Sequence, residues 1–183
     1  METDEALVRR ARAGDAEAFG VLVSRHQKAV AGFLLSVLHD LDAAQDAAQQ
    51  AFVRAFMRLE SFEERSSFKT WVSRIALNVA RSRLRWARMS NWLSLDAPRD
   101  SEGGTWEESV RRAGPREDET RVLEKKLDLE RALAALSPRE REVAAMRLEG
   151  YSLDEVAGVL GISEGTVKST LFAATRKMRQ RLL

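Results

Sequence analysis

The stretch from Ser152 to Ser169, "SLDEVAGVLGISEGTVKS", contains two short helical patterns with only Gly161, Ile162 and Ser163 between them. A helix-turn-helix needs a residue at its turn that tolerates a left-handed backbone, and Gly161 meets this need. It also needs small and apolar residues of both helices to meet in one core, and the spacing predicts this set: Val156, Ala157, Leu160, Ile162, Val167 and Leu171. The pattern is typical of DNA-reading units, whose second helix presents its exposed N-terminal half to the major groove.

The expected outer face of that second helix carries side chains that suit DNA. It contains Glu164, Lys168, Ser169 and Phe172, followed by the cations Arg176, Lys177 and Arg179. Lys168 and Ser169 can donate hydrogen bonds to phosphates or base edges, and Phe172 can contact a thymine methyl group. The alternative is an ordinary helical bundle whose basic last helix is only a solvated face. A helix-turn-helix alone does not say which kind of DNA-binding protein carries it.

Helical periodicity extends over most of the chain and strand patterns are nearly absent, so we expect an all-α fold. Capping residues and glycines place the expected helices at about 4–13, 15–38, 42–59, 68–86, 120–136, 137–149, 152–160 and 163–182. Ser137 and Ser152 each stand three residues before a glutamate, which predicts two capping boxes. These boxes favour the helix-turn-helix interpretation over a generic bundle.

Charge is distributed unevenly along the 183 residues, although the formal net charge is only +2. The segment 76–92 has four arginines and no acid, and 162–183 has five cations against one acid. Between them, 96–119 has eight acids against four bases, with prolines and glycines but no apolar period. We therefore expect two small helical domains, 1–92 and 120–183, joined by a flexible acidic linker over 93–119.

The segment from Glu60 to Arg88, "ESFEERSSFKTWVSRIALNVARSRLRWAR", combines a polar loop, the aromatic residues Phe68 and Trp71, and an arginine-rich helix. Aromatic rings beside a basic groove suit unpaired bases, which can stack on them. Helical spacing of Trp71 with Ile75 and Val79 favours the alternative that these residues belong to the core. By itself, the segment only suggests contact with single-stranded nucleic acid.

Taken together, the motifs resemble the extracytoplasmic-function (ECF) class of the bacterial sigma-70 family of RNA polymerase sigma factors. "AGDAEAFGVLVSRH" and "DAAQDAAQQAFVRAF" look like the start of the sigma-2 domain, and "SFKTWVSRIALNVARSRLR" looks like its promoter-melting segment. "LSPREREVAAMRLEGYSLDEVAGVLGISEGTVKSTL" looks like the sigma-4 domain. The resemblance covers nearly all of the chain and implies a non-enzymatic specificity subunit for promoter-directed initiation.

The resemblance also implies three sets of contact residues. The −35 promoter element would be contacted by Ser163, Glu164, Thr166, Lys168, Ser169, Phe172, Arg176 and Lys177. The loop 61–67 would capture a base flipped out of the −10 element, and the full −10 set is Ser61, Phe62, Ser66, Ser67, Phe68, Lys69, Trp71, Asn78, Arg81 and Arg85. The core polymerase would be bound through Asp46, Gln49, Gln50, Phe52, Val53 and Arg54.

The partners implied are core RNA polymerase, through its clamp and flap regions, promoter DNA and an anti-sigma factor, with no small-molecule substrate and no cofactor. Gln50, Arg81, Thr170 and Ala173 depart from the family pattern and leave the promoter sequence open. The absence of cysteine and of any visible signal peptide or membrane span favours the cytoplasm.

Two other classes of function compete with this one. A polymerase-independent helix-turn-helix regulator would normally dimerise on paired half-sites. An enzyme has little support, because the two histidines do not form a metal-binding or catalytic pattern. We expect His26 to be a surface residue and His39 to be a cation at a helix end.

Overall fold

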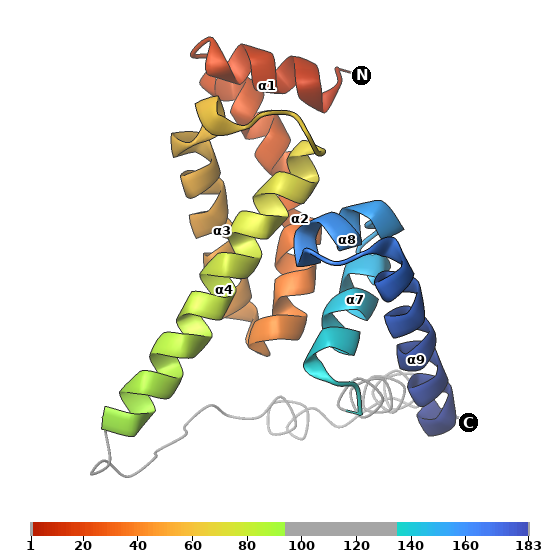
Figure 1. Ribbon diagram of the computed structural model, residues 1–183. Helices are drawn as coiled ribbons and strands as arrows, with labels where there is room; N and C mark the ends of the chain where they lie inside the picture. Colours follow the sequence, from red (N-terminus) through yellow and green to blue (C-terminus); the bar gives the residue numbers. More distant parts are fainter. Residues whose placement is uncertain (1, 94–134, 183) are drawn as a thin grey trace, which may run out of the picture.

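The computed structural model describes residues 2–93 and 135–182, and every regular element in these two ranges is helical (Figure 1). The first range forms α1 (Asp4–Arg12), α2 (Ala16–Leu38), α3 (Leu41–Met57), the 3-10 turn η1 (Leu59–Ser61) and α4 (Phe68–Leu93). The second forms α7 (Pro138–Leu148), α8 (Leu153–Leu160) and α9 (Glu164–Leu182). The all-α prediction is confirmed for these ranges, whereas the predicted linker apart from Leu93 and nearly all of the predicted helix over 120–136 lie outside the described residues.

Side-chain caps begin three of the helices where the sequence predicts them, at Asp15, Ser137 and Ser152. The Asp15 carboxylate accepts hydrogen bonds from the backbone N–H groups of Glu17 and Ala18, both at 3.1 Å. Both predicted capping boxes are formed, at Ser137 and at Ser152. Each cap satisfies N–H groups that have no partner inside the helix, which is why these short polar residues decide where a helix starts.

Two predicted helix boundaries are wrong. The third helix begins at Leu41 rather than Asp42, because Asp40 is its cap and accepts from the Ala43 N–H at 2.7 Å. Helix α4 continues to Leu93 rather than ending near Trp86. No proline or glycine occurs between these two positions, so nothing in the local sequence stops the helix there.

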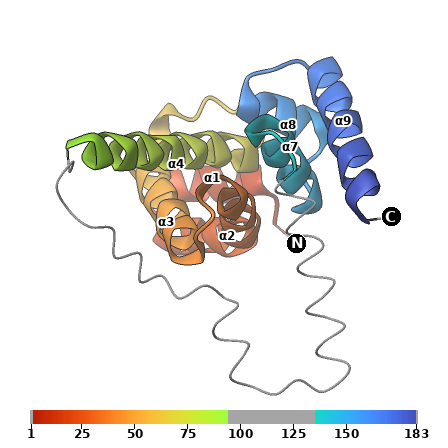
Figure 2. The ribbon, with the colours of Figure 1, turned by 90° about the horizontal axis from the view of Figure 1, so that it is seen from below.

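The helices form two lobes, which we call the first lobe (2–93) and the second lobe (135–182). In the first lobe α2, α3 and α4 surround a core that includes Leu22, Phe33 and Val72. The second lobe packs α7, α8 and α9 around residues such as Val143 and Val167. Seen from below, the C-terminal part of α4 extends beyond α2 and α3 (Figure 2).

The two lobes pack directly against each other. Helix α7 lies against α2, and α8 lies against α4 (Figure 1). Buried apolar residues of both lobes belong to one continuous cluster. The sequence did not predict this arrangement, because no local pattern specifies which helices of separate domains will meet.

None of the helices described is long and apolar enough to cross a membrane.

Gly161 provides a test of the helix-turn-helix geometry. Its φ of 66° is left-handed, as the sequence predicts, and this conformation disfavours side chains. We expect Gly161→Ala to lower the free energy of unfolding by about 1–2 kcal/mol. Gly165→Ala is the matched control: its new Cβ meets only Ser163 Oγ at 3.7 Å, and helix propensity predicts a gain of about 1 kcal/mol. Urea denaturation of both variants measures the difference. If Gly161→Ala leaves the free energy of unfolding unchanged, the left-handed turn does not disfavour a side chain at this position.

Candidate nucleic-acid interface

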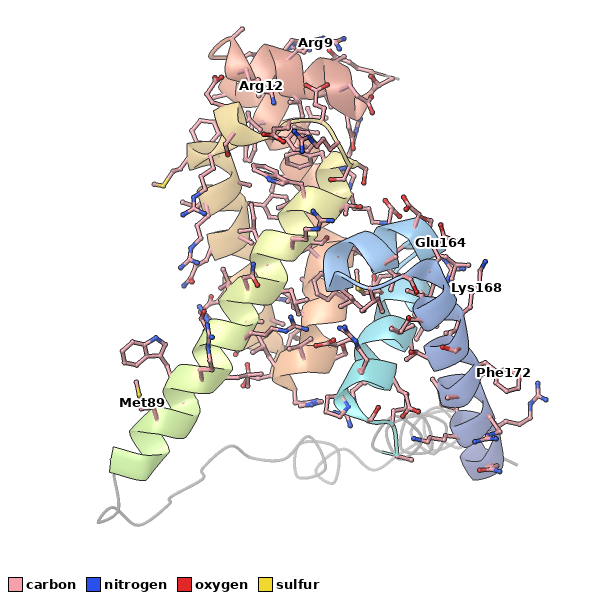
Figure 3. The ribbon with its side chains drawn as sticks, in the orientation of Figure 1. Arg9, Arg12, Met89, Glu164, Lys168 and Phe172 are labelled. Carbon is pink, nitrogen blue, oxygen red and sulfur yellow. The ribbon has the colours of Figure 1, made fainter. Side chains whose placement is uncertain are left out.

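Helix α9 is held by its inner face and leaves its outer face open. The N–H of Thr166 donates to Ser163 Oγ at 3.1 Å, which caps the helix, and Val167 is fully buried against α7 and α8. On the other side Glu164, Lys168 and Phe172 point outward (Figure 3). The Phe172 side chain is among the most exposed apolar groups described, at 72%. The predicted separation of a buried from an exposed face is therefore confirmed.

Two predicted cations of α9 differ in their surroundings. Arg176 is exposed, but the Lys177 ammonium donates to the Glu140 carboxylate at 2.7 Å. This bond, together with the Ser137 N–H of the capping box, holds the pKa of Glu140 below its ordinary value. Lys177 thus stabilises the contact between α9 and α7 in this conformation. Lys177 is predicted to neutralise the charge of the DNA backbone, and in this conformation its charge is paired with Glu140.

The arginine-rich face of α4 is exposed in part. Asn78, Arg81 and Arg85 are exposed and border a shallow hollow on the same side of the helix. Arg81 is also within 3.3 Å of the Glu142 carboxylate of α7. A polyanion binding here would compete with Glu142 for the same guanidinium.

The predicted base-capture loop is built around buried aromatic rings. Phe62 and Phe68 are 5% and 2% exposed, and Phe62 packs on Trp71 with ring centroids 4.9 Å apart. This burial contradicts the prediction that Phe62 and Phe68 contact DNA themselves, because their apolar faces are already covered. Trp71 is half-buried against the same core, as the spacing favoured. Ser61 and Ser67 are exposed and Ser66 is half-buried, so the polar side of the loop faces outward.

The second lobe covers the start of α4 through Tyr151. The Tyr151 side chain is fully buried, its hydroxyl shares a 2.8 Å hydrogen bond with Ser73, and its ring meets Phe33 edge-on. Burial raises the pKa of the Tyr151 phenol, so the group stays neutral. The Lys69 ammonium lies 3.8 Å from the centre of the same ring. Tyr151 therefore joins α2 and α4 to the second lobe.

Polar contacts surround this aromatic anchor. Lys69 donates to the Gly150 carbonyl at 3.2 Å and lies 3.6 Å from the Glu155 carboxylate. Ser67 donates to Glu155 at 3.2 Å, and Arg74 donates to the Gly158 carbonyl. Three residues predicted to contact the −10 element thus contact the second lobe in this arrangement: Ser67, Lys69 and Arg81.

An apolar groove of about 1040 Å³ runs between α2 and α3 of the first lobe, and Glu149 of the second lobe also lines it. Four of the predicted polymerase-binding residues line it, and these are Asp46, Gln49, Phe52 and Val53. Val53 is 51% exposed, whereas Phe52 is buried and forms part of the floor. Gln50 and Arg54 are exposed on α3 outside the groove. The structure thus brings most of the predicted set to one surface.

Sequence reasoning missed several residues of these surfaces. The groove is also lined by the exposed residues Leu35, Leu41, Phe56 and Met57. The spacing of Val53, Phe56 and Met57 was the available signal, because an apolar edge opposite the alanines of α3 has no place in that helix's own core. Tyr151 precedes the Ser152 cap, where a local rule predicts a staple to Val156 but not a contact with another lobe.

The two histidines differ from their predicted roles. His26 is not a simple surface residue, since its Nε2 lies 2.6 Å from the Asp4 carboxylate and its side chain is largely buried. His39 ends α2 with a φ of 58°, and its Nε2 lies 2.7 Å from Arg141. Burial and the charge of Arg141 lower the pKa of His39, so it is not the predicted helix-end cation. A neutral imidazole can accept the bond from Arg141.

Comparison with known proteins places both lobes in one family. The model of sigma-70 region 2 matches residues 22–89, and that of sigma-70 region 4 matches 126–178. The RNA polymerase sigma-H factor of Pseudomonas aeruginosa is 32% identical over 180 residues, covering 95% of this chain and 91% of that protein. The chain belongs to the ECF class of sigma factors. The ECF RNA polymerase sigma-E factor of Escherichia coli K12 is likewise 33% identical over 179 residues, covering 94% of this chain and 90% of that protein.

Two solved structures share the fold of this chain. The structure of CnrH in complex with the cytosolic domain of CnrY matches 99% of this sigma factor and 97% of CnrH, with a TM-score of 0.67 and 26% identity. RpoE of Bartonella quintana, solved with the anti-sigma factor NepR, shares the fold with a TM-score of 0.65 at 22% identity over 90% of this chain and 96% of RpoE. As a sigma factor, the chain binds RNA polymerase and directs promoter-specific initiation, and it is not an enzyme. The regulator alternative is set aside.

Proposed function

We propose that this ECF sigma factor divides promoter recognition between its two lobes. The outer face of α9 reads the −35 element, and the loop 61–67 with the exposed face of α4 holds the opened −10 element. The groove between α2 and α3 binds the clamp of the polymerase. This division corresponds to the domains 1–92 and 120–183 with a linker at 93–119.

The observation that carries the −35 assignment is the exposed ring of Phe172. An aromatic side chain on a well-packed helix gains nothing from full exposure, and here it lies beyond Lys168 on a face with no covering element described. A ring and a cation on one helix face match a thymine methyl beside a phosphate or a base acceptor. The face is thus suited to the major groove.

The contacts between the lobes support a change of arrangement on promoter binding. Lys69 and Arg81 cannot direct their charges to DNA and to the carboxylates of the second lobe at the same time. Two promoter elements can be contacted together only if the lobes stand apart, and a tether then raises the effective concentration of the second lobe at its site. We therefore propose that the lobes separate when the holoenzyme forms on DNA.

Transcription with core polymerase tests this proposal. A genomic fragment library first identifies a promoter, and Phe172→Ala is then compared with wild type on it and on a copy with a scrambled −35 element. We expect Phe172→Ala to lower transcription from the intact promoter roughly tenfold, which corresponds to a loss of about 1–3 kcal/mol in the free energy of promoter recognition. On the scrambled copy the two proteins should perform equally, because the contact is already gone. An equal loss on both promoters would contradict reading by α9.

We also propose that an anti-sigma factor binds this protein and that the protein acts in the cytoplasm. Both proposals rest on the family resemblance. A pull-down of the sigma factor with core polymerase, repeated after adding fractions of the native cell extract, tests for a component that displaces polymerase.

A further inference from the structure

Arg12, the last residue of α1, joins the N-terminal helix to the loop that follows α3. Its Nε donates to the Leu59 carbonyl at 3.2 Å, and its Nη2 donates to the Phe62 carbonyl. Its Nη1 donates to the Glu64 carboxylate at 2.8 Å. One guanidinium therefore holds three points within six consecutive residues, and these points are about fifty positions away in the sequence.

The same group packs on the loop as well as bonding to it. The Arg12 guanidinium carbon lies 5.9 Å from the centre of the Phe62 ring, whose other contacts are with Phe68 and Trp71. The Arg12 side chain is only 24% exposed. Contacts with carbonyls, a carboxylate and a ring leave the guanidinium little freedom to serve as a phosphate anchor.

The loop has few backbone hydrogen bonds of its own. Backbone hydrogen bonds close the short turn η1, and the next regular helical bonds begin at Ser67 with the start of α4. Glu64 has a φ of 57°, which is unfavourable for a residue with a side chain. Such a conformation persists only where the surroundings impose it, and Arg12 supplies that constraint through the Glu64 carboxylate.

We propose that Arg12 is a positioning residue for base capture, fixing the loop 61–67 in the shape that receives a base flipped from the −10 element. This inference rests on the proposed function of the loop. Ordering a loop in advance lowers the entropy lost on binding, so a preformed loop holds a base more tightly than a mobile one. Arg12 acts through the loop and is not itself a base contact.

The decisive variant is Arg12→Lys, which keeps the positive charge but loses the planar fork. A lysine presents one ammonium and cannot bond Leu59, Phe62 and Glu64 in this geometry. Arg9→Lys is the matched control, because it makes the same substitution at an exposed position of the same helix (Figure 3). Glu64→Gln is a second variant, which removes the charge partner without altering α1.

The measurement uses holoenzyme bound to pre-melted promoters that carry either an intact base or an abasic site at each −10 position of the non-template strand. At the position of the captured base, wild type and Arg9→Lys should bind the promoter with an intact base roughly tenfold more tightly than the promoter with an abasic site. This difference is about the value of one stacked base. Arg12→Lys should lose most of that preference, and Glu64→Gln part of it. Affinity for core polymerase and the preference at the −35 element should stay unchanged in all three variants.

The outcomes separate the two hypotheses. If wild type shows no position at which an intact base is preferred, the base-capture role of the loop fails. If wild type shows the preference and Arg12→Lys retains it in full, the role of Arg12 fails alone. A uniform loss of affinity at every position, including abasic ones, would mean that Arg12 serves only general stability or charge.

Discussion

Tyr151→Ala is expected to separate the two lobes. The substitution removes a fully buried aromatic side chain from between Phe33, Ser73 and Lys69. Loss of a buried aromatic side chain costs about 3–5 kcal/mol. Part of this cost falls on the contact between lobes, so the lobes should part before either one unfolds. Small-angle scattering should show a larger radius of gyration, and urea denaturation an earlier transition.

Leu148→Ala is the control for this expectation. Leu148 ends α7 three residues before Tyr151 but is exposed, so its truncation should change stability by less than about 0.5 kcal/mol and leave the dimensions unchanged. The milder pair Tyr151→Phe and Ser73→Ala adds a further check. Tyr151→Phe leaves the buried Ser73 hydroxyl without its partner, and Ser73→Ala does the same to the Tyr151 hydroxyl. The double variant removes both hydroxyls. If Tyr151→Ala is as compact as wild type, Tyr151 is not the anchor between the lobes.

Val53→Asp should produce the largest loss of polymerase binding among changes to the exposed surface. Val53 lies in the apolar groove between α2 and α3, and a carboxylate there would lose its water if the polymerase clamp docks in the groove as proposed. An unpaired buried charge at an interface costs about 2–5 kcal/mol, which corresponds to roughly thirty-fold or more in the dissociation constant. Titration of fluorescently labelled sigma factor with core polymerase measures this directly.

Val21→Asp is the matched control for the groove. Val21 is exposed on α2 but does not line the groove, so the same substitution should leave polymerase binding near the wild-type value. Circular dichroism of both variants should match wild type, because both side chains are already accessible to water. Wild-type affinity in Val53→Asp would show that polymerase docks elsewhere.

The distribution of the site residues explains why only part of the site could be predicted. The face of α9 was predictable because one helix period decides which residues oppose Val167. The prediction of the −10 contact residues was less accurate. Aromatic rings that suit bases, such as those of Phe62 and Phe68, suit a protein core equally well, and here they are buried in the core. Lys177 was placed on the correct helix, but its pairing with Glu140 depends on α7 and was not visible in the sequence.

The sequence by itself determined the all-helical fold, the caps at Asp15, Ser137 and Ser152 and the turn at Gly161, because each depends on residues within a few positions of one another. It also determined the family, through motifs that occur in a fixed order along the chain. The tertiary structure alone decided that Tyr151 meets Phe33, that Arg12 holds the loop at Glu64, and that α2 and α3 leave an apolar groove open. These contacts join residues far apart in the chain, and such contacts form only where whole helices pack together and exclude water.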